Sequence, residues 1–394
     1  MNPHASAGSV ESGTTKFEVR QVRSVRDLPD AALDPLATSL HSSASWLAFQ
    51  EIEKTGGWSS YLLACAPDST VVAALPMYRL TSDANPNYLL QRVFPAALAG
   101  DGPQVLIGNS HGYDNALLVH PDLTPQDRQA ALAQLVDAAL ELVRRDGIET
   151  AWWPYLDHAS MRALRPLLAD AVPVAMKNEC SLRLAGTGFD DYLGQLSRNR
   201  RTAVKAERRR FAAAGYDVRG RRLSEAVHDV ARLGVETARK YGSTLDVETA
   251  RKMTAAQAKL LDDTSIVLTC TRQDEAVGIA LLMDHHDRSY LRTVGFDYAR
   301  VGDGAAEYFE LAFYQPIERA YSLGITEVSL GVSSYRAKTF RGATLRPRWA
   351  LPLLVPAWPQ AAARRHNASQ LHAYEQELEG RRSAIPHADY EDYC

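Results

Sequence analysis

Cysteine is scarce in this chain, and the few cysteines lie far apart. Only four occur among 394 residues, with no CxxC pair and no neighbouring histidine cluster. This spacing makes a disulfide framework and a zinc site unlikely, and it is typical of a protein in the reducing cytosol. His285, His286 and Asp287 lack a third spaced ligand, so we expect a turn there and no metal.

Long apolar runs are also missing. None reaches the roughly 18 residues that a membrane helix needs, so no membrane span is expected. Residues 1–15 are rich in Ser, Gly and Ala and lack the apolar stretch of a signal peptide, which predicts a disordered tail on a cytoplasmic protein. The net charge of −3 argues against a protein that coats nucleic acid, although it leaves a local basic patch open. Neither a Gly-x-Ser-x-Gly elbow nor a P-loop occurs, so nothing supports covalent serine catalysis or ATP hydrolysis.

The length and composition predict two globular domains. Apolar content of 46% and charged content of 23% are ordinary for folded proteins, and 394 residues suit two units of about 150–200 residues. Gly186, Thr187 and Gly188 mark the expected boundary. We therefore predict a tail at 1–15, an N-terminal domain at 16–185, a C-terminal domain with the donor site at 186–355, and a C-terminal helix and tail at 356–394.

The two halves repeat the same order of elements. A hairpin around residues 61–75 parallels one around 266–281, and a helix ending near Gly147 parallels one ending near Gly324. Alternating apolar residues predict the strands, and helical spacing predicts the connections. The pattern indicates a tandem duplication of one mixed α/β unit, with coincidence as the alternative.

One stretch, residues 289–344, carries the features expected of a reaction site. It reads as a strand, a glycine-bearing loop, a helix, a second strand and a serine-rich basic segment. A helix that begins in glycines after a strand offers free N–H groups and a positive dipole end to an anion or a polarised carbonyl. Acyl-transfer folds need this element.

The glycine loop resembles the Q/R-x-x-G-x-G/A pyrophosphate cradle of GNAT-superfamily acyltransferases. Gly302 and Gly304 match the two glycines, and the resemblance implies that they and Arg300 bind the donor. Two positions depart from the pattern, because Ala299 stands at the Gln/Arg position and Asp303 lies between the glycines. A carboxylate repels a pyrophosphate, which makes coenzyme A a doubtful donor. In the alternative interpretation, the glycines only turn the chain and Asp303 caps the helix.

The segment Lys338-Thr339-Phe340-Arg341-Gly342, following Gly331 at a strand end, looks like the C-terminal signature of FemAB-like proteins. The likeness covers roughly residues 40–355. It implies an α/β fold of two tandem GNAT-like domains with mixed sheets. It also implies transfer of an aminoacyl group from an aminoacyl-tRNA to an amine, with no cofactor beyond that co-substrate. The long helical arm of cell-wall members is not seen here, which favours the amine or hydroxylamine of a small acceptor, in a specialised, antibiotic-type pathway.

Candidate site residues follow from this likeness and from strand ends. Asp297 directly follows a strand and is the first candidate for a general base, with Glu307 second. Lys338 and Arg341 supply positive charge for a donor phosphate or an oxyanion, and the same segment offers Tyr335 as a proton donor and Ser333 as a donor contact. Each has a plain alternative as a turn residue, a salt bridge or packing.

A cationic helix could provide the tRNA contacts. Arg198, Arg201, Lys205 and Arg208 share one helical stripe and are predicted to follow an acceptor stem, although a solvated helix face is the alternative. Tyr78 and Arg79 are the candidate acceptor contacts from the first half. Two other functions stay open: an acyl-CoA-dependent N-acyltransferase and a non-catalytic binding module. The sequence does not predict the oligomeric state.

Overall fold

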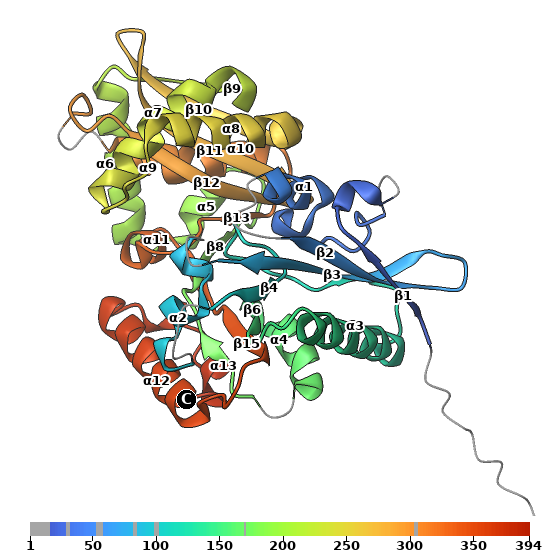
Figure 1. Cartoon of the computed structure of the whole chain (residues 1–394). Helices are drawn as coiled ribbons and strands as arrows, with labels where there is room; N and C mark the ends of the chain where they lie inside the picture. The colour runs from blue at the N-terminus through green and yellow to red at the C-terminus, as the bar shows by residue number, and fades with distance from the viewer. Residues whose placement is uncertain are drawn as a thin grey trace, which may run out of the picture.

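The computed structural model describes residues 16–28, 32–52, 58–81, 85–97, 102–168, 171–302 and 306–394. These residues form two mixed β-sheets with helices around each, one sheet in the upper and one in the lower part of Figure 1. The prediction of an α/β protein built from two tandem mixed units is confirmed. The predicted tail at 1–15 lies outside the described residues.

The first sheet has the order β1-β2-β3-β4-β6-β15-β7, and β5 pairs with β3. Its neighbouring strands are antiparallel except for β4 and β6, which run parallel because the helix α3 connects them. The strands are β1 (Glu18–Val22), β2 (Ser59–Cys65), β3 (Val71–Leu80), β4 (Gln104–Ile107), β5 (Leu118–Val119), β6 (Ala151–Leu156), β7 (Val174–Ala175) and β15 (Trp349–Leu354).

The second sheet has the order β14-β8-β13-β12-β11-β10-β9. Here β12 and β13 are the parallel pair, and the remaining neighbours are antiparallel. The strands are β8 (Glu179–Arg183), β9 (Asp217–Arg221), β10 (Ser265–Arg272), β11 (Glu275–His285), β12 (Arg288–Phe296), β13 (Glu327–Ser329) and β14 (Thr344–Arg346). Each unit is thus an antiparallel meander followed by one parallel strand reached through helices, as the repeat predicted.

Helices cover both sheets. The helix α3 begins as predicted, since Thr124 accepts a hydrogen bond from the Asp127 amide and Pro125 takes the first position. Around the first sheet lie α1 (Ala44–Ile52), α2 (Leu90–Val93), α3 (Pro125–Arg145), α4 (His158–Leu164), α12 (Gln360–Glu377) and α13 (Ala388–Glu391). The second has α5 (Phe189–Gln195), α6 (Arg198–Ala213), α7 (Leu223–Lys240), α8 (Val247–Leu261), α9 (Glu307–Phe309), a π-helical turn (Glu310–Tyr314), α10 (Gln315–Ser322) and α11 (Tyr335–Phe340).

Two of these helices differ from the sequence prediction. The basic helix predicted from Phe189 to Ala214 is two helices, because Leu196 and Ser197 adopt extended backbone between α5 and α6. The short helix α11 lies in the segment read only as serine-rich and basic. It begins after two residues of left-handed conformation, Ser333 and Ser334, which no local propensity favours.

Strands from each half of the chain complete the sheet of the other. The strand β8 precedes the predicted boundary at 185/186, yet it pairs with β13 and β14 in the second sheet. The strand β15 precedes residue 355, yet it pairs with β6 and β7 in the first sheet. The predicted domain limits therefore do not coincide with the limits of the two sheets.

The described residues were also compared with what disulfide-bonded, metal-binding and membrane-spanning proteins require. All four cysteines are free. Over the described ranges, no group of three His, Cys, Asp or Glu side chains is arranged to hold a metal ion. Within the same ranges, every helix is too short or too polar to cross a bilayer.

Candidate functional site

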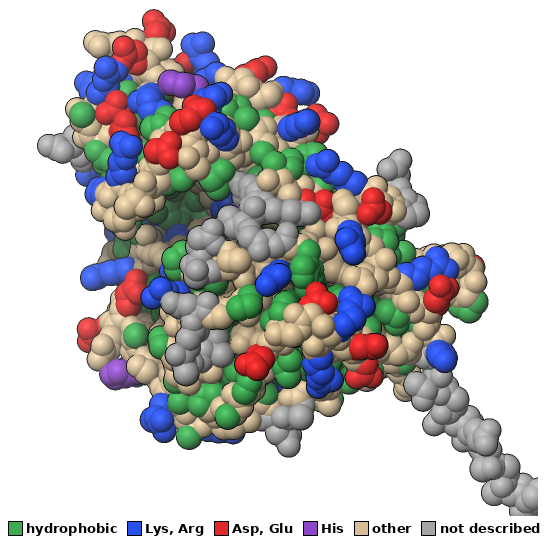
Figure 2. All heavy atoms as spheres, in the orientation of Figure 1, with side chains coloured by type: hydrophobic (Ala, Val, Ile, Leu, Met, Phe, Trp, Pro, Cys, Tyr) green, Lys and Arg blue, Asp and Glu red, His purple; other side chains and the backbone are tan. Residues whose placement is uncertain are grey.

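A cavity opens where the parallel strands of the second sheet separate. The strands β12 and β13 pair through three residues and part after Tyr290 and Ser329. Beyond that point the side of β12 and the loop after β13 line a cavity of about 450 Å³. Figure 2 shows a hollow between the upper and lower parts of the molecule at the left, where α11 lies in Figure 1. The predicted separation of the strands is present.

In the first sheet the equivalent opening is filled. The strands β4 and β6 pair at Val105 and Leu106 and then part in the same way. Between them lies the side chain of Asn115, whose Nδ2 donates to the carbonyl oxygens of Ile107 at 3.1 Å and Pro154 at 3.0 Å. Because this amide closes the gap, only the second unit offers an open site of this kind within the described chain.

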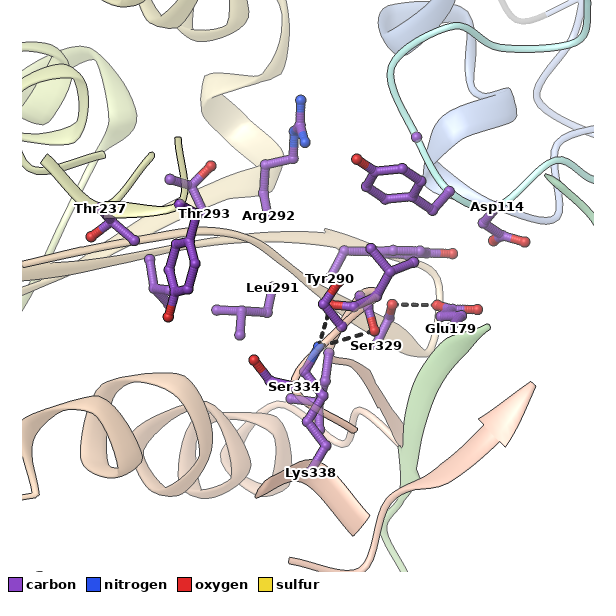
Figure 3. Close-up of a pocket in the computed structure, with 18 of the residues that line it drawn as sticks. Asp114, Glu179, Thr237, Tyr290, Leu291, Arg292, Thr293, Ser329, Ser334 and Lys338 are labelled. Atoms are coloured by element: carbon purple, nitrogen blue, oxygen red, sulfur yellow. Dashed lines mark hydrogen bonds between the residues drawn. The ribbon is translucent and has the colours of Figure 1, made fainter. Parts of the chain in front are cut away.

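Lys338 projects into the cavity from α11 and is almost fully buried. Its Nζ donates to the carbonyl oxygens of Gly331 at 3.1 Å and Val332 at 2.8 Å, drawn as dashed lines in Figure 3. No carboxylate of the described residues pairs with it, and burial lowers the pKa of the Lys338 ammonium to about 8. Two of its three protons are donated to carbonyls, which leaves one for a bound molecule.

The loop that holds these carbonyls has strained backbone. Gly331, Ser333 and Ser334 have φ angles of 66°, 66° and 52°, in the left-handed region that non-glycine residues seldom adopt. Ser333 and Ser334 both line the cavity. Residues with strained backbone are held in place by the surrounding structure, and they are found most often at binding and active sites.

The cavity wall opposite β12 comes from the first half of the chain and from β8. His41, Asp114 and Glu179 lie there, as Figure 3 shows for the two carboxylates. Buried Arg348 pairs with Glu179 and, at 2.9 Å, with Asp114, and Glu179 accepts a hydrogen bond from the Ser329 hydroxyl. Burial would raise the pKa of Asp114, but Arg348 and other nearby cations lower it below its ordinary value. Asp114 is therefore ionised.

His41 is a neutral side chain in this wall. Burial lowers the pKa of the His41 imidazole to about 3. Its ring packs edge-on against Trp46 and Tyr290, with centroids 4.7 and 5.3 Å away. Gly112 packs so closely that a Cβ there would overlap the imidazole. The ring is held in one place and can accept a hydrogen bond.

A second, smaller cavity of about 220 Å³ adjoins the first. Both cavities are lined by Tyr241, Phe296, Tyr298, Tyr308 and Ser334, so they form one connected space. Tyr241 is 77% exposed and Tyr298 is 40% exposed, and they are two of four large apolar side chains exposed among the described residues. The Lys240 ammonium lies 4.0 Å from the centre of the Tyr298 ring.

The predicted pyrophosphate cradle is partly described, since Gly304 lies outside the described residues. Gly302 donates its N–H to the carboxylate of Glu307 at 2.9 Å and to the Tyr216 hydroxyl at 2.8 Å. Tyr216 in turn donates to Glu307 at 2.5 Å. Glu307 reaches the smaller cavity, but its carboxylate takes the amide that a phosphate would use. Arg300 pairs with Glu275 and Asp297 and lines neither cavity.

Asp297 and Arg341 do not face the cavity. Asp297 pairs with Arg232 at 3.7 Å and accepts a hydrogen bond from the Ala299 amide, so it closes a turn. Arg341 is buried and its guanidinium donates to Glu207 at 2.7 Å, to Tyr314 at 2.9 Å and to a backbone carbonyl. Its role is to tie α11 to α6. The prediction that it contacts the donor does not fit this placement.

Other predicted residues are distributed as follows. Tyr335 is buried against the Tyr374 ring behind the cavity, with centroids 5.2 Å apart. On α6, Arg208 pairs with Glu318 at 2.6 Å and Glu310 at 3.2 Å, so it is not free for tRNA. The remaining stripe residues, Arg198, Arg201 and Lys205, are at least partly exposed and have no carboxylate partner among the described residues.

The candidate acceptor contacts Tyr78 and Arg79 lie elsewhere. Tyr78 is buried in the first sheet, where its hydroxyl is 3.0 Å from that of Tyr61, and neither predicted residue lines a cavity described above. The first half contributes His41 and Asp114 instead, which the sequence reading missed. Glu179 was missed as well; it is the first residue of β8, which also contains Ser181 and Arg183, so the local pattern carries no signal of its burial.

Comparison with known proteins places this chain in a family. A sequence model of the FemAB-like family, described as peptidoglycan biosynthesis and recognition, matches residues 25–389. No curated protein matches the chain. Among solved structures, FemX is similar with a TM-score of 0.58 at 12% identity, over 85% of this chain and 97% of that chain. A conserved protein of unknown function from Bacteroides thetaiotaomicron has a TM-score of 0.53 at 11% identity, over 85% of this chain and 99% of that chain. At these identities the likeness shows the fold alone.

Proposed function

The chain belongs to the FemAB-like family, and on that premise we propose that it transfers an aminoacyl group from an aminoacyl-tRNA to a small acceptor. The acceptor atom is the nitrogen of an amine or hydroxylamine. The coarser assignment, an acyltransferase-type protein of this family, rests on the match over residues 25–389 and on the fold.

The observation that carries the choice of donor is the state of the glycine cradle. Glu307 holds the Gly302 amide, so a carboxylate stands where a coenzyme A pyrophosphate would be bound. A second negative group there is repelled, and no arginine or lysine of the described residues pairs with Glu307. An aminoacyl ester does not need this cradle, because the ester is already activated and can be held through its RNA.

Lys338 is the proposed catalytic residue. An amine nitrogen attacks the ester carbonyl, the N–C bond forms, and the former carbonyl oxygen becomes an oxyanion. The free Nζ–H of Lys338 can donate to that oxyanion and then give a proton to the ribose oxygen as the C–O bond breaks. The amine nitrogen loses one proton as it becomes an amide, and this proton restores the Lys338 ammonium. The carbonyls of Gly331 and Val332 fix the ammonium in place beforehand, which lowers the reorganisation needed during reaction.

The two sides of the cavity suit two substrates. Exposed Tyr241 and Tyr298 at the connected mouth provide aromatic faces for the terminal base of the RNA, with Lys240 beside them. On the opposite wall, neutral His41 can accept a hydrogen bond from the incoming amine, and the ionised Asp114 attracts its ammonium form. We therefore place the donor on the side of α7 and the acceptor between the two sheets.

A transfer assay tests this function directly. The protein is incubated with tRNA charged with mixtures of radiolabelled amino acids and with candidate amines and hydroxylamine, and the labelled amide or hydroxamate product is counted. Prior digestion of the charged tRNA with ribonuclease, followed by quenching of the nuclease, should abolish the product. Product formation that survives this digestion, or no product with any charged tRNA, contradicts the proposal.

Two other functions make different predictions. A coenzyme-A-dependent N-acyltransferase would be stabilised against heat by micromolar acetyl-CoA in a saturable manner, whereas the occupied Gly302 amide leads us to expect no such shift. A non-catalytic binding module would retain its biological output when Lys338 is replaced. Thermal shift with acetyl-CoA and the activity of the Lys338 variant therefore separate all three.

A further inference from the structure

Two arginines from distant parts of the chain lie over the ring of Phe340 on α11, and a third, Arg336, lies beside one of them. The guanidinium carbons of Arg200, at the start of α6, and Arg381, after α12, lie 5.8 and 5.6 Å from the centre of the Phe340 ring. Arg381 also donates to the backbone oxygen of Arg336 on α11. In Figure 1 the three helices α6, α11 and α12 lie along the left side of the molecule.

This arginine cluster (Arg200, Arg336 and Arg381) has no counter-charge of its own. Within the described part of the chain, no carboxylate lies at ion-pair distance from any of the three. Neighbouring Arg341 and Arg208, by contrast, are both paired with glutamates. Burial lowers the pKa of the Arg381 guanidinium, and the positive charges of Arg200 and Arg336 lower it further. Like charges held together raise the free energy of the free protein, and a bound anion relieves that repulsion.

The position of the cluster relates it to the cavity. Arg336 and Lys338 are two residues apart on α11, so they point about 200° apart around the helix axis. Lys338 faces the cavity and Arg336 is exposed on the opposite side. A helix is about 10–12 Å wide, so a phosphate bound at Arg336 lies about one helix width from the cavity.

The surroundings favour a nucleic acid over other polyanions. Exposed Arg198 and Lys205, with half-buried Arg201, continue the positive charge along α6 without carboxylate partners in the described ranges. The half-buried Phe340 ring holds the guanidinium groups of Arg200 and Arg381 over it. Large exposed apolar side chains, which a membrane surface would bind, lie elsewhere in the described chain, at Ile52, Tyr241, Tyr298 and Leu323.

We propose that Arg200, Arg336 and Arg381 bind backbone phosphates of the donor RNA next to its single-stranded 3′ end, so that the end passes around α11 to Lys338. This site rests on the proposed function, because the RNA is the aminoacyl donor. Guanidinium groups from three elements recognise phosphates by charge and bidentate hydrogen bonds, without reading sequence. The cluster sets donor affinity and does not touch the reacting atoms.

Binding of fluorescently labelled, deacylated bulk tRNA tests the site over a range of salt concentrations. The test variant is Arg200→Gln/Arg336→Gln/Arg381→Gln. Its matched control is Arg144→Gln/Arg209→Gln/Arg210→Gln, which loses the same charge from exposed arginines that lack carboxylate partners, two of them on α6 itself. We expect the test variant to bind tRNA at least about tenfold more weakly at about 0.1 M salt, with a salt slope smaller by about two. The control should stay within about threefold of the wild type.

Kinetics separate a failure of this site from a failure of the function. In the transfer assay, the KM for aminoacyl-tRNA should rise about tenfold in the test variant while kcat stays within about twofold. Equal tRNA binding by test and control variants overturns the site and leaves the function standing. A wild type that binds no tRNA overturns both.

Loss of binding to vesicles of phosphatidylglycerol in the test variant, with tRNA binding intact, would assign the cluster to lipid and overturn the site as well. If the triple variant fails to fold, the exposed single variant Arg336→Gln should still weaken tRNA binding about threefold and carry the same decision.

Discussion

Replacing Lys338 with methionine separates its proposed catalytic role from a structural one. Methionine has a similar length, no charge and a flexible apolar chain, so it can occupy the same buried space. The ammonium that it removes is the proposed donor to the oxyanion and the leaving oxygen. Removing one donor to an oxyanion reduces kcat by roughly 100- to 1,000-fold in a well-studied hydrolase. We expect a loss of that size in aminoacyl transfer.

The same change has opposing effects on stability that largely cancel. The low pKa of about 8 for Lys338, against 10.5 in water, corresponds to a penalty of about 3 kcal/mol on the buried ammonium. Methionine relieves this penalty, but the carbonyls of Gly331 and Val332 then lose their donor, which costs about 1–3 kcal/mol each where water does not replace it. The opposing terms leave a net change between about 1 kcal/mol of stabilisation and about 3 kcal/mol of destabilisation.

The assay measures kcat and the urea midpoint of one protein preparation side by side. Lys259→Met, an exposed position on α8, is the matched control and should change neither quantity. The reasoning is refuted if Lys338→Met keeps more than about a third of the wild-type kcat. It is also refuted if activity falls only in proportion to the fraction unfolded.

Three further predictions follow from the same contacts. If transfer requires the Lys338 ammonium, kcat should be highest below the folded pKa of this group and should decline as pH rises through about 8. A pH–kcat profile measures this decline, which should be absent in Lys338→Met. Arg341→Leu leaves Glu207 buried without its partner and should destabilise the fold by about 3–5 kcal/mol in urea unfolding; a shift under about 1 kcal/mol would show that the pair is unimportant. Gly112→Ala forces the His41 ring to move, because the new Cβ would overlap it. The KM for the acceptor should rise several-fold and the KM for aminoacyl-tRNA should stay unchanged. Equal effects on both KM values would argue against separate sides of the cavity for the two substrates.

Local patterns in the sequence were sufficient for most of the fold. Alternating strands, the capped helix α3 and the repeated hairpins depend on residues close together in the chain, so their periodicity was informative. The separation of β12 and β13 and the position of Lys338 also followed, because a strand end, a glycine and a basic segment are consecutive. These features needed no knowledge of distant partners.

The parts that were missed depend on distant partners. Arg341 could be recognised as internal only through Glu207, 134 residues earlier in the chain. Arg348 meets Glu179 across 169 residues because β8 and β15 change sheets, and a sequence read by halves does not reveal that exchange. Burial of a charged side chain requires a partner that only the tertiary fold supplies, so neither buried pair could be inferred from the local pattern.

The exchange of β8 and β15 also has a consequence for taking the protein apart. A polypeptide ending at residue 185 would carry β8 away from its neighbours β13 and β14 and would leave β6 without β15. Neither fragment would possess a complete sheet, so each would expose unpaired strand edges that favour aggregation. Expression of isolated halves is therefore a poor route to a minimal enzyme, and circular permutation through exposed loops is the better one.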